Sequence, residues 1–186
     1  MFAIYINDLA DDDVIKSCKK LYADDSKLLA PIDPAPFPEN EQLPLQADLD
    51  RIMKWCETWL MELNAEKCKV MHFGIRNPRH KYHVVKGGEK YTLVTTTVER
   101  DLGVLLSSDM RWTAQSEETA VKASRMLGLL KNTFRTRTER VWKSLCSTYV
   151  QPLLEFAVPA WSPVLERDAR VLERVQRGAT RIRHSL

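Results

Sequence analysis

The residues best suited to chemistry are two adjacent carboxylates in the tetrapeptide Tyr22-Ala23-Asp24-Asp25. The flanking segments 19–21 and 26–29 are typical of two β-strands joined by a tight polar turn. Two carboxylates at such a tip repel each other, and a hard divalent cation relieves the repulsion by taking their oxygens as ligands. Nucleotide-transferring enzymes hold Mg²⁺ against a triphosphate in this way. The alternative is a surface turn built from good turn residues, and the tetrapeptide alone favours that interpretation.

Motifs elsewhere in the chain favour the metal-binding interpretation. In order along the sequence they are the segments 2–9 (FAIYINDL), 45–52 (LQADLDRI), 63–74 (LNAEKCKVMHFG), 99–104 (ERDLGV) and 156–163 (FAVPAWSP). Together with the tetrapeptide, their order and spacing closely resemble the reverse transcriptase of non-long-terminal-repeat retrotransposons of the jockey-like type. The resemblance extends from residue 2 to residue 186, and several separated motifs in order are far more specific than one tetrapeptide.

This resemblance implies an α+β fold, namely part of a polymerase palm followed by a helical thumb. Residues 1–110 would form the later part of the palm, with antiparallel strands, helices, the Asp-Asp hairpin and a second hairpin that grips the primer. Residues 111–186 would form the all-helical thumb. The implied activity of the intact protein is RNA-templated DNA synthesis by two-metal nucleotidyl transfer. The implied partners are an RNA template, a DNA primer, deoxynucleoside triphosphates and Mg²⁺.

The resemblance also assigns roles to individual residues. Asp24 would be a metal ligand and Asp25 its weaker companion beside the primer end, while Tyr22 would sit under the primer. Lys67 matches the lysine that protonates or screens the departing pyrophosphate. An ordinary exposed lysine at a helix-to-strand junction is the alternative for Lys67. Leu102 and Gly103 match the hairpin that grips the primer backbone, where glycine permits close approach.

One departure from the family pattern bears on activity. The family's third metal-binding aspartate lies in a strand upstream of Phe2 that this sequence does not contain, and the fingers and the nucleotide-pocket loop are also absent. Asp8 and residues 11–13 suit helix capping or solvation better than a replacement ligand. We therefore expect catalysis by this chain to be impaired. The alternative function is a catalytically inactive remnant that acts at most as an RNA or RNA–DNA binding module.

Charge is divided unevenly along the chain. Residues 111–186 carry 14 Lys+Arg and 7 Asp+Glu, a net charge of +7, whereas residues 1–110 carry 14 and 18, a net charge of −4. The acidic part contains the Asp-Asp tetrapeptide, and the basic part is suited to holding a polyanion.

The basic part ends in an amphipathic segment with two helical stripes. Its apolar stripe recurs at steps of three and four, and its basic stripe lies roughly opposite at about 100° per residue. Such a row of arginines suits contact with successive phosphates. A solvated helix face, with Glu166, Asp168 and Glu173 as ion-pair partners, is the alternative. The apolar stripe consists of Leu165, Ala169, Leu172, Val175, Ala179 and Ile182, and the basic stripe of Arg167, Arg170, Arg174, Arg177 and Arg181.

Composition limits the remaining possibilities. The 186 residues, 44% of them apolar, can bury a core. The four cysteines are scattered without a C-x-x-C pair, which favours reduced thiols in an intracellular protein over a disulfide scaffold or a zinc site. No apolar run reaches membrane-spanning length and no signal peptide is visible. The sequence does not indicate whether the protein lies in the nucleus or the cytoplasm, and it identifies no obligate protein partner.

Periodicity predicts the other elements. Helices are expected over 45–63, over 114–134 with Ala120, Ala123, Leu127 and Leu130 inward, and over 140–150, ending before Pro152. A strand is expected over 68–73, and a hairpin over 80–97 that turns at Gly87-Gly88.

Overall fold

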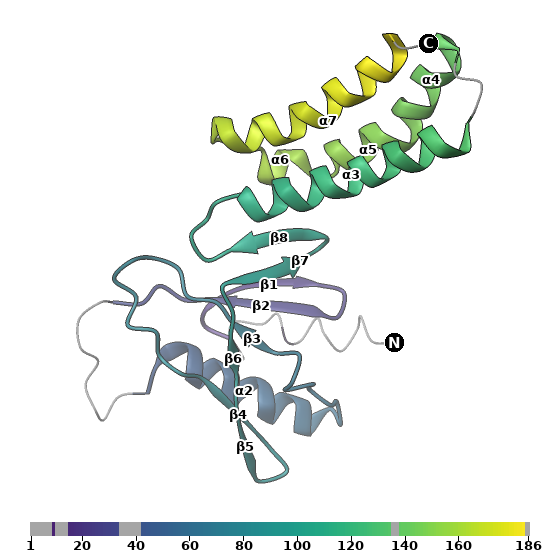
Figure 1. Cartoon of the computed structure of the whole chain (residues 1–186). Helices are drawn as coiled ribbons and strands as arrows, with labels where there is room; N and C mark the ends of the chain where they lie inside the picture. The colour runs from purple at the N-terminus through teal and green to yellow at the C-terminus, as the bar shows by residue number, and fades with distance from the viewer. Residues whose placement is uncertain (1–8, 10–14, 34–41, 135–137, 185–186) are drawn as a thin grey trace. The chain divides into compact units, whose positions relative to one another are not determined.

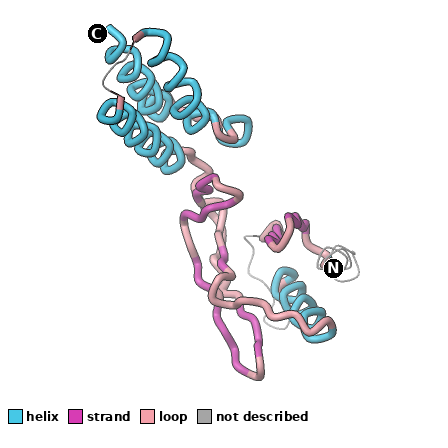
Figure 2. Tube along the Cα trace, turned by 90° about the vertical axis from the view of Figure 1, so that its right-hand side faces the viewer, coloured by secondary structure: helices cyan, strands magenta, loops and turns pink. Residues whose placement is uncertain are grey.

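The computed structural model describes Leu9 and residues 15–33, 42–134 and 138–184 of the chain. The chain divides into two compact units, residues 1–96 and residues 97–186. The first unit contains small sheets and one long helix, and the second contains a hairpin and a group of helices (Figures 1 and 2). The expected mixture of helices and strands is confirmed.

In the first unit, β1 (Cys18–Tyr22) and β2 (Asp25–Leu29) form an antiparallel hairpin. Helix α2 (Pro44–Thr58) follows, with proline in its first turn, where the missing N–H has no cost. Short strands β3 (Lys69–Val70) and β6 (Val94–Thr95) pair in parallel. Strands β4 (His83–Lys86) and β5 (Glu89–Thr92) form the predicted hairpin, with Gly87 and Gly88 at its turn in the left-handed region.

Helix α2 packs its apolar residues against both hairpins. Ile52 and Cys56 join Leu9 and Ile15 in one buried cluster, on which Leu28 of β2 packs. Met53 joins a second cluster with Tyr82, Val84 and Leu93. The predicted helix therefore exists, but it ends at Thr58 rather than at residue 63. The predicted strand 68–73 is limited to Lys69–Val70, because the chain bends away through the following loop.

The second unit begins with the antiparallel hairpin of β7 (Val98–Asp101) and β8 (Val104–Ser107). Helix α3 (Thr113–Thr133) follows, close to the predicted range, and all four predicted inward residues are buried. The hairpin therefore belongs to the same compact unit as the helices, although the sequence placed it with residues 1–110. The Arg100–Glu118 ion pair and the hydrogen bond from the Leu105 N–H to Gln115 join the hairpin to α3.

The next three elements run as one nearly continuous helix: α4 (Glu139–Leu145), a π-helical turn (Cys146–Val150) and α5 (Gln151–Glu155). The prediction that the helix ends before Pro152 is wrong. Proline lacks an N–H and its ring clashes with the carbonyl four residues earlier. The wider π turn brings the Gln151 N–H to the Cys146 carbonyl, and the chain continues helically through the proline.

Helices α6 (Val158–Trp161) and α7 (Glu166–His184) complete the second unit. In Figure 1, α7 runs alongside α3. The buried cluster joins α3, the α4–α5 helix and α7, and the Trp142 indole N–H donates to the Ala179 carbonyl at 2.9 Å. In the described ranges, we find no helix that is both long enough and apolar enough to cross a membrane.

Candidate metal-ligand hairpin and nucleic-acid interface

The tetrapeptide Tyr22-Ala23-Asp24-Asp25 lies at the tip of the β1–β2 hairpin, as predicted from the sequence. Tyr22 pairs with Asp25 in the ladder, so Ala23 and Asp24 are the two turn residues. Ala23 adopts a left-handed φ of 51°, which a residue with a Cβ rarely occupies. Asp24 and Asp25 are exposed and Tyr22 is 64% exposed. Both carboxylates are therefore accessible to a ligand from solvent.

The donor atoms at this tip suit Mg²⁺, which prefers carboxylate oxygens. The ligand set is incomplete, however, because the described part of the chain brings together no group of three His, Cys, Asp or Glu residues. Asp8 and residues 11–13, the upstream carboxylates weighed from the sequence, lie outside the described residues.

Lys67 lies in the turn between α2 and β3, with an exposed side chain. Its backbone N–H donates to the carbonyl and to the side-chain oxygen of Asn64, each at 3.2 Å. These bonds fix the backbone of the turn and leave the ammonium group in solvent. The catalytic role of Lys67 stays a prediction.

The second predicted hairpin turns at Leu102 and Gly103. Asp101 pairs with Val104, and the two turn residues have φ of 46° and 87°. Left-handed conformation at both positions is the pattern of the type I′ turn, which matches the twist of a hairpin. Leucine is unusual there, and its side chain is 50% exposed, so burial does not offset the strain.

Polar contacts tie this hairpin to α3. The Arg100 guanidinium donates to both carboxylate oxygens of Glu118, at 2.7 and 2.8 Å, and to the Gly103 carbonyl at 3.3 Å. The Leu105 N–H donates to the side-chain oxygen of Gln115 at 2.8 Å. Lys122 also reaches Glu118 at 2.8 Å, and hydrogen bonds from Lys122 and Arg100 lower the pKa of this carboxyl. The turn is thus held in a defined position on the helical unit.

The Phe156 ring lies so close to Gly103 that it leaves little room for a side chain there. A Cβ at this position would lie 3.1 Å from Phe156 Cε1, in addition to the strain of a positive φ.

We expect Gly103→Ala to lower the free energy of unfolding by about 1–3 kcal/mol, measured by chemical denaturation. Gly128→Ala is the matched control, since a Cβ there meets nothing within 4 Å inside α3. It should raise stability by about 0.5–1 kcal/mol, and equal effects of the two changes would contradict this account.

The five arginines of the predicted basic stripe lie on α7 and are exposed. Arg170 pairs with Glu166 at 2.6 Å and Arg177 with Glu173 at 2.8 Å, both in i,i+4 spacing. Exposed pairs of this kind contribute about 0.3–0.5 kcal/mol each, so a phosphate can displace them at little cost. Arg174 and Arg181 make no ion pair with any residue that the structure describes.

Asp168, the remaining predicted ion-pair partner, lies in a buried position. Asp168 is only 2% exposed, and its carboxylate accepts a hydrogen bond from the Thr113 hydroxyl at 3.0 Å. Arg167 contacts both partners, with Nε 3.5 Å from Asp168 and Nη2 3.1 Å from the Thr113 hydroxyl oxygen. Asp168 therefore pairs with a stripe arginine, as predicted, but it is buried instead of lying on the solvated face, and it joins the beginnings of α3 and α7.

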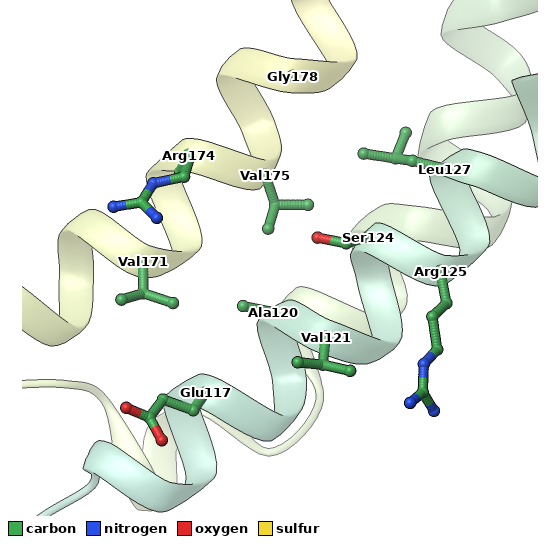
Figure 3. Close-up of a pocket in the computed structure, with 10 residues that line it drawn as sticks. All are labelled: Glu117, Ala120, Val121, Ser124, Arg125, Leu127, Val171, Arg174, Val175 and Gly178. Atoms are coloured by element: carbon green, nitrogen blue, oxygen red, sulfur yellow. The ribbon is translucent and has the colours of Figure 1, made fainter.

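A shallow groove of about 620 Å³ is lined by residues of both α3 and α7. Figure 3 shows Val171 and Val175 pointing from α7 toward α3, while Arg125 points away from α7. Arg174 borders both this groove and the arginine-rich surface of α7. Among the described residues, only Arg174 and Gly178 line both the groove and the arginine-rich surface, which places the two features on adjacent sides of α7.

The predicted site residues are thus divided between the two units, and no described contact joins Lys67 to the Asp24–Asp25 turn or the α7 arginines to the Leu102–Gly103 turn. Tyr22, Asp24, Asp25 and Lys67 lie in the first unit, whereas Leu102, Gly103 and the α7 arginines lie in the second. Sequence reasoning missed the Arg100–Glu118 contact and the buried carboxylates of Asp48 and Asp168. No family model, no curated protein and no solved structure matches the chain.

Proposed function

We propose that the chain is the later palm and the thumb of a reverse transcriptase of a non-long-terminal-repeat retrotransposon. Its own function is then to bind RNA or an RNA–DNA duplex through the arginine surface of α7 (Arg167, Arg170, Arg174, Arg177 and Arg181). In the intact protein the bound duplex is the template and primer for DNA synthesis from deoxynucleoside triphosphates.

The observation that carries this proposal is the row of exposed arginines on one helix. Positions 170, 174, 177 and 181 recur at steps of four and three, so their guanidinium groups project from the same side of α7. Two of them have no ion pair among the described residues, and two hold only exposed, weak ones. Guanidinium groups bind phosphate oxygens in a bidentate manner, which suits them to a nucleic-acid backbone.

Two hairpin turns support the polymerase assignment. Both place a residue other than glycine in the left-handed region at an exposed tip, Ala23 in one hairpin and Leu102 in the other. Two-residue hairpin turns favour this conformation, and the exposed tips present Asp24 in one hairpin and Gly103 in the other to solvent. Asp24 and Asp25 would supply two Mg²⁺ ligands, and the chemistry the ions supply in such enzymes is activation of the primer hydroxyl and neutralisation of the leaving pyrophosphate.

Equilibrium binding of the full chain to an RNA–DNA duplex at several salt concentrations tests this function. Each phosphate contact contributes about −0.9 to the slope of log K against log salt. Contacts from the two unpaired arginines alone predict a slope near −2, and contacts from all five predict about −4.5. Affinity should therefore fall roughly ten-fold to several hundred-fold between about 50 and about 200 mM salt. A salt-independent affinity, or no binding at low salt, would contradict the proposal.

Primer extension on a homopolymer template with Mg²⁺ distinguishes a chain that only binds nucleic acid from one that also synthesises DNA. Because the described ligand set is incomplete, we expect binding without incorporation. Incorporation that disappears in Asp24→Ala would instead show that this chain is a working polymerase. Asp33→Ala is the matched control, since Asp33 lies outside the hairpin.

A further inference from the structure

Among the described residues of the first unit, the carboxylate of Asp48 is the most completely buried charged group. It lies in α2, is 0% exposed and holds the segment that precedes β1. Its Oδ1 accepts the Lys16 N–H at 3.1 Å and its Oδ2 accepts the Ser17 N–H at 2.8 Å. The Arg51 guanidinium, one turn along α2, also contacts Oδ1.

A buried carboxylate is costly unless charge partners and hydrogen bonds compensate it. Burial raises the pKa of Asp48, but hydrogen bonds from the Ser17 side chain and from the two backbone N–H groups, with the charge of Arg51, outweigh that effect. The pKa therefore lies below its ordinary value, and the group stays ionised. An ionised carboxylate accepts two N–H groups more strongly than a neutral side chain does.

The N–H groups of Lys16 and Ser17 lie where hydrogen bonds to Asp48 can orient the β1–β2 hairpin. Lys16 and Ser17 come just before Cys18, the first residue that pairs in the β1–β2 ladder. In the described residues this hairpin is a two-stranded sheet with no further strand beside it. An isolated two-stranded hairpin is only marginally stable in water, so its orientation depends on what ties it to the rest of the unit.

We propose that Asp48 is a positioning residue, which holds the Asp24–Asp25 turn in a fixed orientation relative to α2 through the two N–H groups that precede β1. The apolar contacts of Ile15 and Leu28 keep the hairpin against α2, but such contacts are non-directional. The two charge-assisted hydrogen bonds that Asp48 accepts are directional, so they fix the orientation of the hairpin. That the turn serves metal binding rests on the proposed function, whereas the effect of Asp48 on its orientation does not.

Hydrogen exchange of the full-length Asp48→Asn variant tests this proposal, peptide by peptide. The amide has nearly the same shape but no charge, and its NH₂ group faces an N–H donor. We expect protection of residues 15–29 to fall about ten-fold, while α2 and the β4–β5 hairpin keep theirs. The amide protons of Lys16 and Ser17 should also move upfield in NMR spectra, because they lose a charged acceptor. Unchanged protection of the hairpin, or an equal loss across the whole first unit, would overturn the proposal.

Two further variants make the result specific. Asp50→Asn is the matched control, because Asp50 lies two residues along α2 and accepts only from the side chains of Gln42 and Gln46 among its described hydrogen bonds. It should leave the hairpin protected. Arg51→Gln keeps both N–H bonds and removes one charge, so it should loosen the same peptides by a smaller factor. If Asp48→Asn does not fold, Arg51→Gln decides: loss confined to residues 15–29 supports the proposal, and any other pattern overturns it.

A separate measurement addresses the metal. Mn²⁺ added to the wild-type chain should broaden the amide signals of residues 23–26. Absence of broadening would remove the metal role of Asp24 and Asp25, and with it part of the proposed function. The exchange experiment would still decide whether Asp48 orients the turn.

Discussion

Replacing Arg170, Arg174 and Arg177 by glutamine is expected to weaken RNA–DNA duplex binding by about ten- to hundred-fold near physiological salt. The three side chains project from one side of α7, and each lost phosphate contact removes counterion release from the binding free energy. The slope of log K against log salt should become less negative by about 1 for each contact removed. Fluorescence anisotropy with a labelled duplex measures both quantities.

The matched control removes the same charge elsewhere in the helical unit. Lys131 on α3 and Arg140 and Lys143 on α4 are exposed and lie outside the α7 surface. Their triple glutamine variant should retain most of the affinity and the wild-type salt slope. If both triple variants bind equally weakly, net charge accounts for binding and the α7 surface has no special role.

Trp161→Ala is expected to destabilise the helical unit by about 3–5 kcal/mol. The side chain is 0% exposed, and its indole N–H donates to the Phe156 carbonyl at 2.7 Å. Truncation therefore leaves a large cavity and an unpaired carbonyl at the loop between α5 and α6. Small domains are stable by only about 5–15 kcal/mol, so this single change consumes much of the total. Chemical denaturation followed by circular dichroism measures the loss.

Tyr149→Ala serves as the control, because Tyr149 belongs to the same unit and is 49% exposed. We expect it to change stability by less than about 1 kcal/mol. A small effect of Trp161→Ala, comparable to that of Tyr149→Ala, would show that the loop between α5 and α6 does not depend on the buried indole.

Elements set by local sequence could be predicted closely. The hairpins that turn at Ala23-Asp24 and at Gly87-Gly88 follow from turn residues between extended segments, and α3 follows from its apolar spacing. The exposed α7 arginines were also readable, because a helical stripe depends only on spacing. The same spacing could not tell whether Glu166 and Glu173 pair with them, since that depends on side-chain conformation.

Features that depend on contacts between distant segments could not be predicted directly from the sequence. Asp48 lies 31 residues from Ser17, and Asp168 lies 55 residues from Thr113. One signal was available for Asp168, because positions 168, 171, 172 and 175 share a helical face whose other members are apolar. A lone carboxylate on such a face indicates a buried partner from another element. No comparable signal marked the π turn before Pro152, where tertiary packing overrides the helix-breaking tendency of proline.

Photo-crosslinking of the full chain to an RNA–DNA duplex, with identification of the attached peptides, tests the central claim most directly. The account predicts that crosslinks concentrate in peptides from residues 166–181 and disappear from them in the Arg170, Arg174 and Arg177 variant. Crosslinks spread evenly over the chain, or crosslinks that leave α7 unmodified in the wild-type protein, would contradict it.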